Sequence, residues 1–143
     1  MNETTGAGVA GQTAKQAANV RLVQAFLEAG AAGEMEKFLA TIDETVVLYV
    51  PEFLPWGGVY RGREELQKGF AAFSAGWETE SFEREFVASD EQVVILQKLK
   101  ARIKKGEQIL ETPLAELFKI RNGKIVEIRP FYFDGGKLAE AFR

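Results

Sequence analysis

The feature that most constrains the fold of this chain is a pair of alternating apolar runs between Leu114 and Asp134, separated by Arg121-Asn122-Gly123. Asn-Gly between two such runs is a strong local signal for a β-hairpin, because both residues tolerate the positive φ angles of a tight turn. Side chains alternate between the two faces of a strand, so the form of the turn decides which residues face the core.

Two forms of the turn are open. A two-residue turn at Asn122-Gly123 would set Glu116 opposite Arg129 and would mix charged and apolar residues on both faces. A three-residue turn, with Gly123 in a left-handed bulge, would set Glu116 opposite Ile128 and would separate the two kinds of residue. We favour the three-residue turn. It predicts a buried face of Leu114, Phe118, Ile128, Pro130 and Tyr132 with Glu116 as its one carboxylate, and an opposite face of Lys119, Arg121, Glu127 and Arg129.

The composition is typical of one globular domain. The chain has 143 residues, of which 46% are hydrophobic and 27% charged, so it is long enough to bury a core. Its net charge of −3 and pI near 5.2 argue against a nucleic-acid binder. The absence of cysteine and histidine excludes disulfides, thiolate chemistry and a histidine base. No apolar run reaches the length of a membrane span and no signal pattern opens the sequence, so we expect a cytoplasmic protein without a membrane partner.

The remaining segments predict helices first and antiparallel strands afterwards. Residues 1–13 are small, polar and glycine-rich, and we interpret them as a disordered tail before a single domain at 14–143. Apolar spacing predicts helices at about 15–30, 35–42, 63–73 and 135–142, and strands at 46–50, 77–88, 92–104 and in the two arms of the hairpin. A loop is expected at 52–62, and Pro113 predicts a bulge before the hairpin. This order is typical of an α+β domain with helices on one face of a bent, mainly antiparallel sheet.

Three short stretches carry a resemblance to a known family. They are Val50-Pro51 at a strand end, the run Tyr60-Arg61-Gly62-Arg63-Glu64-Glu65-Leu66, and Tyr132-Phe133-Asp134 at the end of the last strand. With the order of elements, they resemble the SnoaL-like family of the ketosteroid isomerase and nuclear transport factor two superfamily. The resemblance covers residues 15 to 142. It implies a cone-shaped α+β barrel with a pocket in its mouth.

The catalytic positions of that superfamily can be compared one at a time. Ketosteroid isomerases carry an Asp before a Pro at the end of the first strand, where this chain has Val50, and a Tyr in the first helix, near Phe26 here. Their second, protonated Asp falls on Glu116, which keeps a carboxyl group. SnoaL-type cyclases and small epoxide hydrolases place an Asp on the last strand, where this chain has Pro130. The resemblance therefore implies a pocket without the familiar catalytic residues.

Glu116 is the candidate for proton transfer, assisted by Tyr132 or Tyr60. A carboxyl group in apolar surroundings has a raised pKa, which makes it a competent acid or a neutral hydrogen-bond donor. Glu116 could instead hydrogen-bond to Tyr49 or Tyr60 and serve only to position the pocket. The expected ligand-binding residues are Phe26, Val50, Trp56, Tyr60, Ile128 and Pro130. With no arginine expected on the inner face, this lining suits a flat, mostly apolar molecule and not a phosphorylated or strongly charged one.

Two classes of function remain open. In the first, the protein is an enzyme that acts by acid/base chemistry on a small hydrophobic carbonyl or cyclic compound without a cofactor or a metal. In the second, it is a non-catalytic module for ligand binding or dimerisation. We also expect a homodimer, because Leu117, Phe131 and Phe133 lie on the outward face of the hairpin and form more exposed apolar surface than a monomer usually carries.

Overall fold

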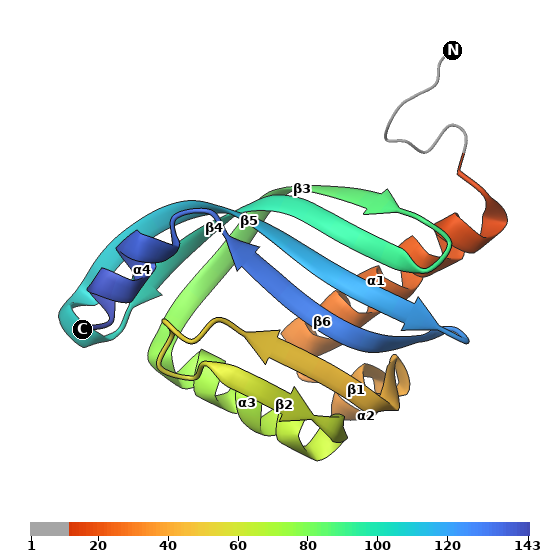
Figure 1. Cartoon of the computed structure of the whole chain (residues 1–143), viewed down its shortest axis with the longest axis horizontal. Helices are drawn as coiled ribbons and strands as arrows, with labels where there is room; N and C mark the ends of the chain where they lie inside the picture. Colours follow the sequence, from red (N-terminus) through yellow and green to blue (C-terminus); the bar gives the residue numbers. More distant parts are fainter. Residues whose placement is uncertain (1–11) are drawn as a thin grey trace, which may run out of the picture.

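The computed structural model describes residues 12–143, and four helices pack around one six-stranded sheet within that range (Figure 1). The elements are α1 (Ala14–Ala32), α2 (Met35–Ala40), β1 (Ile42–Val50), β2 (Gly58–Arg61), α3 (Gly62–Gly76), β3 (Trp77–Ala88), β4 (Gln92–Ile103), a 3₁₀ turn (Lys105–Glu107), β5 (Gln108–Arg121), β6 (Lys124–Tyr132) and α4 (Gly135–Ala141). No helix within residues 12–143 is long and apolar enough to cross a membrane.

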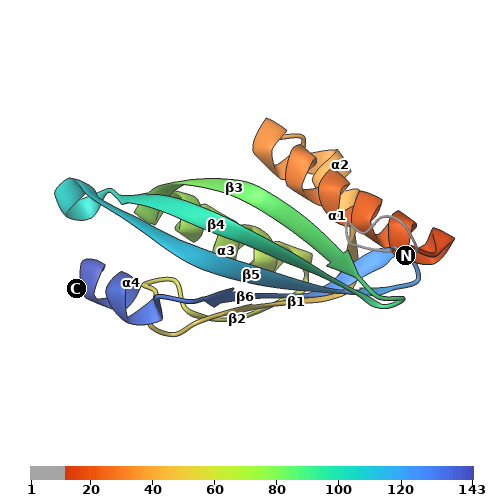
Figure 2. The same cartoon turned by 90° about the horizontal axis from the view of Figure 1, so that it is seen from above.

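The sheet has the strand order β2-β1-β6-β5-β4-β3. All neighbouring pairs are antiparallel except β1 and β6, which run parallel. The helices α1 and α3 lie along the same, inner face of this bent sheet (Figure 2). The predicted α+β class and cone-like architecture are confirmed, although the sheet stays open because β2 and β3 are both edges.

Helix α1 begins and ends with clear signals. The Thr13 hydroxyl accepts a hydrogen bond from the Gln16 backbone N–H, and the Gln16 side chain accepts one from the Thr13 backbone, which makes a capping box. Gly33 ends the helix in a left-handed conformation with φ of 70°. The predicted tail covers residues 1–13. Residues 1–11 lie outside the described part of the chain, and Thr13 belongs to the cap of α1.

The hairpin is present, but its predicted three-residue turn is wrong. Arg121 pairs with Lys124 across a two-residue turn in which both Asn122 and Gly123 have positive φ, at 53° and 72°. The register then shifts next to the turn, and Val126 is left as an extra residue in β6. Glu116 consequently lies opposite Pro130 rather than Ile128.

The predicted faces of the hairpin are nevertheless correct. The real register differs from the predicted one by two residues, and a shift of two keeps every side chain on its face. The inner face holds Leu114, Glu116, Phe118, Ile128, Pro130 and Tyr132.

Three local predictions need correction. Residue 42 begins β1 rather than extending α2, and the expected loop at 52–62 contains the short strand β2. Pro113 makes no bulge: β4 and β5 pair without a break, and Pro113 lies opposite Lys98. Its missing N–H is tolerated there because Pro113 lies where the pairing of β5 with β6 ends, one residue beyond the Leu114–Tyr132 pair.

A bulge occurs instead in β3. Phe82 pairs with Lys98 and Glu85 pairs with Leu96, so Glu83 and Arg84 together face the single residue between them in β4. Glu83 has a positive φ of 55°. Before the bulge the odd-numbered residues of β3 face inward, and after it the even-numbered residues do.

The core consists of two apolar clusters on the inner face. The first lies under α1 and α2 and contains Val23, Phe26, Ile42, Phe118 and Ile125; the second lies towards α4 and contains Trp56, Trp77, Leu99, Ile103 and Leu138. Val50 packs against both clusters. The strands β4, β5 and β6 run beneath both, so inward residues at the middle of these strands lie between the clusters.

Candidate functional site

Four polar side chains from four neighbouring strands lie between the two apolar clusters. They are Arg84 on β3, Gln97 on β4, Glu116 on β5 and Tyr132 on β6, and we call them the polar belt. Leu114 pairs with both Gln97 and Tyr132, and Glu116 is two residues further along β5 on the same face. The register of the sheet therefore brings these four residues together across the inner face.

Hydrogen bonds connect three members of the belt. Gln97 Nε2 donates to Glu116 Oε1 at 2.8 Å, and Arg84 Nε donates to Gln97 Oε1 at 3.1 Å. Gln97 is only 6% exposed, so its amide is held between an arginine and a carboxyl group. The arginine orients the amide oxygen, which leaves the amide N–H₂ directed at Glu116.

Two other polar atoms of the belt take no part in these hydrogen bonds. Within residues 12–143, the second carboxyl oxygen of Glu116 and the hydroxyl of Tyr132 have no hydrogen-bond partner. Both residues are partly rather than fully buried, so each keeps some accessible surface. An apolar site with a few convergent polar groups is the usual composition of a small-molecule site.

The environment changes the acidity of both groups. Burial raises the pKa of the Glu116 carboxyl, while the hydrogen bond from Gln97 and the positive charge of Arg84 partly oppose this rise. Burial and then the charge of Glu116 raise the pKa of the Tyr132 hydroxyl. The predicted direction for Glu116 is confirmed. A raised pKa favours the neutral acid, which can donate a hydrogen bond or a proton.

The residues predicted to line one pocket are divided among different places. Phe26 packs in the first cluster, stacked on Phe38 with ring centroids 4.8 Å apart. Pro130 lies opposite Glu116 on β6, and Ile128 precedes it on the same buried face. Of these three predicted residues, only Pro130 therefore lies directly beside the polar belt.

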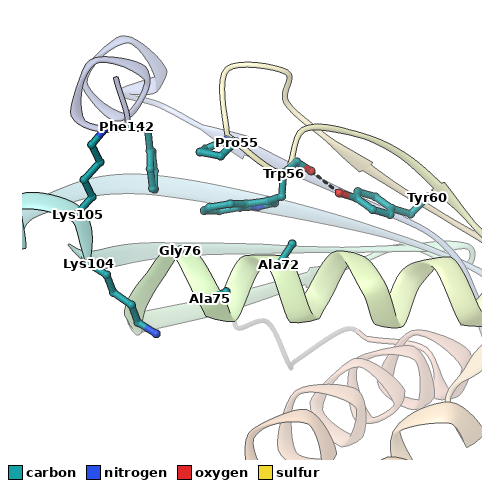
Figure 3. Close-up of a pocket in the computed structure, with 9 residues that line it drawn as sticks. All are labelled: Pro55, Trp56, Tyr60, Ala72, Ala75, Gly76, Lys104, Lys105 and Phe142. Carbon is teal, nitrogen blue, oxygen red and sulfur yellow. Dashed lines mark hydrogen bonds between the residues drawn. The ribbon is translucent and has the colours of Figure 1, made fainter.

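Trp56 and Tyr60 lie on a separate surface cleft of about 670 Å³ (Figure 3). The Tyr60 hydroxyl donates to the Trp56 carbonyl at 2.6 Å, which ties the loop before β2 to that strand. The Trp56 ring approaches α3 so closely that residue 76 has to be a glycine, because a Cβ at Gly76 would lie 2.4 Å from the ring. Lys104 and Lys105 lie at one end of the cleft.

Two further cavities flank the molecule. One of about 420 Å³ lies between α1, α2 and α3 and includes Phe26, Phe38, Phe70 and Phe73. The other, of about 340 Å³, includes Leu96, Phe131 and Phe133 of the outer sheet face together with Gln97 and Tyr132. Glu116 is not part of the lining of any of these three cavities.

Sequence reasoning missed Gln97 and Arg84. Gln97 had a usable signal, since it is the one polar residue on the face of β4 that carries Val93, Ile95, Leu99, Ala101 and Ile103. Arg84 had none, because the bulge in β3 reverses the alternation that a sequence pattern relies on. The expectation that no arginine reaches the inner face is wrong for that reason.

The chain matches a family model described as a SnoaL-like domain over residues 23–128. The protein belongs to the SnoaL-like domain family. Among the described residues of this SnoaL-like protein, no group of three or more acidic, histidine or cysteine side chains could hold a metal ion.

Solved structures share the fold of this SnoaL-like protein. An NTF2-like protein from Burkholderia xenovorans LB400 is 27% identical, with a TM-score of 0.84 over 90% of this chain and 98% of that one. TerC, co-crystallised with polyporic acid, is 16% identical with a TM-score of 0.75 over 86% and 96%. A candidate polyketide cyclase from Xanthomonas campestris pv. campestris is 19% identical with a TM-score of 0.72 over 90% and 97%. Among curated proteins, none matches the sequence.

Proposed function

We propose that this SnoaL-like protein binds a small, flat, mostly apolar molecule at the polar belt and acts on it by acid/base chemistry. The observation that carries the proposal is the partly buried Glu116 carboxyl, which receives a hydrogen bond from a buried amide and has one oxygen without a partner among the described residues. A structural carboxyl group in an apolar core would be expected to have both oxygens satisfied.

Glu116 and Tyr132 have complementary roles in this proposal. The neutral carboxyl of Glu116 donates a hydrogen bond, and then a proton, to a carbonyl oxygen of the ligand. Tyr132, whose raised pKa keeps its hydroxyl protonated, donates a second hydrogen bond to the same region. Gln97 stabilises the carboxylate that remains after proton transfer, because its N–H₂ already contacts that group.

The apolar body of the ligand would contact Val50, Pro130 and Leu114, which surround the belt on neighbouring strands. Phe26 and Ile128 lie deeper in the first cluster and would limit the length of the ligand. A relative of the same fold was co-crystallised with polyporic acid, and others are named as candidate polyketide cyclases. These names are consistent with a cyclic small molecule as the ligand class.

The test is a binding screen of flat aromatic ketones and phenols, followed by ligand-observed NMR. Glu116→Gln should weaken the binding of any hit by about tenfold, because an amide N–H is a weaker hydrogen-bond donor than a neutral carboxyl group and cannot transfer a proton. Glu127→Gln is the matched control on the other face of the hairpin and should leave binding unchanged. Equal effects of the two substitutions would overturn the proposal.

A second candidate, a dimerisation module, is favoured by a different observation. We propose that two copies of the chain associate through the outer face of the sheet. Phe131 and Phe133 are 53% and 79% exposed there, beside Leu96 at 44%. They surround the outer cavity of about 340 Å³, which gives a partner surface a place to insert side chains. The two proposals are compatible, because they use opposite faces.

A further inference from the structure

Arg84 reaches the inner face only because of the bulge in β3. In a regular strand, the alternation that starts with the inward residue Trp77 would continue to the end. Arg84 would then point outward, like the other even-numbered residues before the bulge. The two-residue bulge at Glu83 and Arg84 reverses this and sets Arg84 beside Gln97. Bulges often re-aim a side chain next to a functional site.

The positive charge of Arg84 is not neutralised within the described part of the chain. Its Nε–H is bonded to Gln97 Oε1, but among residues 12–143 no carboxylate lies within ion-pair distance of its guanidinium. The adjacent Glu83 pairs with Lys98 at 3.1 Å on the outer side. The four N–H groups at the end of the guanidinium have no partner among the described residues, and they can bind a planar anion with two parallel hydrogen bonds.

The position of Arg84 makes it accessible to a ligand. It lies in the middle of the edge strand β3, and its side chain is exposed. Helix α3 joins β3 at Trp77, whereas α1 contacts the other end, where Asn19 donates to the Ser89 and Asp90 carbonyls. The two helices therefore approach the two ends of β3, and the bulge lies between them.

Gln97 sets the separation between this cation and the carboxyl group. Two hydrogen bonds, of 3.1 Å and 2.8 Å, and one amide group lie between Arg84 and Glu116. That arrangement places the guanidinium within roughly 8 Å of the carboxyl oxygen. A benzene ring with a carboxylate and a carbonyl group at opposite positions has a similar span.

We infer that the polar belt selects aromatic or cyclic ligands that carry a carboxylate as well as a carbonyl group. The carboxylate pairs with the Nη atoms of Arg84, and the carbonyl oxygen faces Glu116 and Tyr132. This inference rests on the proposed function, since it uses the same site and names its ligand class. It revises the expectation of a mostly apolar ligand without strong charge, which assumed an inner face without arginine.

The test compares 4-acetylbenzoate with its neutral isostere 4′-methylacetophenone by ligand-observed NMR titration at low ionic strength. We expect the native protein to bind the keto acid about tenfold more tightly than the ketone. The reason is that a bidentate, charge-assisted hydrogen bond between a carboxylate and a guanidinium is stronger than a neutral contact. Arg84→Gln should abolish this preference, measured as the ratio of the two affinities within the one variant, and Arg84→Lys should keep part of it. Added salt should reduce the preference in the native protein.

Arg102→Gln is the matched control, because Arg102 is a cation on the outer side of β4 that pairs with Glu78 and Glu107. It should not change either affinity. Equal binding of the two compounds by the native protein, or a preference that survives in Arg84→Gln, would overturn the inference. Measurable ketone binding in Arg84→Gln, even if it is weaker than in the native protein, shows that the variant is folded.

The outcomes separate this inference from the proposed function. If the ketone binds and depends on Glu116 but the carboxylate adds nothing, the inference fails and the proposed function stands. If the keto acid binds through Arg84 alone and Glu116→Gln has no effect, the acid/base proposal fails and the anion site stands. If neither compound binds at millimolar concentration, both are overturned.

Discussion

The two faces of the sheet are opposites in composition. The inner face is apolar and carries a few polar residues, which form the belt of Arg84, Gln97, Glu116 and Tyr132. The outer face is rich in charged residues, such as Lys98 and Lys100 on β4, and carries a few large apolar residues that include Phe131. Burial of a polar group and exposure of an apolar one both cost free energy. The exceptions on each face are therefore the residues for which a function is proposed.

The largest expected effect tests which face holds the core. Phe118 is fully buried and packs edge-on against Phe26 with centroids 5.6 Å apart. Phe118→Ala should lower the free energy of unfolding by about 3–5 kcal/mol, because it removes apolar contacts and leaves a cavity. Leu117→Ala, one residue away on the outer face, should cost less than about 1 kcal/mol if the chain is monomeric under the conditions used. Urea unfolding of both variants measures the contrast, and similar losses would contradict it.

The next effect concerns the apolar residues of the outer face. Phe131→Lys should weaken the association of two copies by about a hundredfold, because it places a charge where apolar surface would be buried. Light scattering at micromolar concentration should give a dimer mass for the native protein and a monomer mass for the variant. Lys119→Gln, on the same face, should leave the dimer intact. A monomeric native protein would refute the dimer outright.

A smaller effect should follow from the pKa of Glu116. Its folded-state pKa is raised, so the folded protein holds a proton that the unfolded chain releases. The stability from this group is therefore fully present below the unfolded pKa, near 4.3, and is lost as the pH rises through the folded pKa. The Glu116→Gln variant lacks this carboxyl group, so its free energy of unfolding does not fall with pH in this way.

The difference in unfolding free energy between Glu116→Gln and the native protein should thus grow in favour of the variant as the pH rises from 4 to 8. Each unit of the pKa rise corresponds to about 1.4 kcal/mol. Urea titrations at several pH values measure it, with Glu127→Gln as the control. A difference that shrinks with rising pH would mean that the carboxylate is stabilised in the fold, contrary to its buried position.

The smallest expected effect is on the Tyr132 hydroxyl. This group has no hydrogen-bond partner among the described residues, so Tyr132→Phe should change stability by no more than about 0.5 kcal/mol. The same substitution should weaken the binding of ketone ligands, since it removes a donor at the site. Unfolding and NMR titration of one variant thus separate a role in stability from a role in binding. A large stability loss with unchanged binding would assign Tyr132 to the core alone.

Much of the fold could be predicted because its signals are local. Trp77–Ala88 was expected as a strand from alternation alone, and the structure has the same bounds. Glu116 could be singled out because it interrupts an apolar face. Gln97 interrupts the apolar face of β4 in the same way, so the same reasoning could have identified it. The oligomeric state, the ligand and the catalytic activity stay predictions, because the structure of a single chain does not test them.

The sequence by itself determined which residues of the hairpin face inward, because a period of two and a strongly apolar set leave little choice. It did not determine the register, since Val126 adds one residue to β6 at a bulge that no pattern marks. Nor did it place Arg84 inside. The bulge in β3 sets Glu83 and Arg84 together opposite Gln97, and only the pairing of β3 with β4 specifies where the extra residue lies. Tertiary pairing, rather than local preference, therefore completed the polar belt.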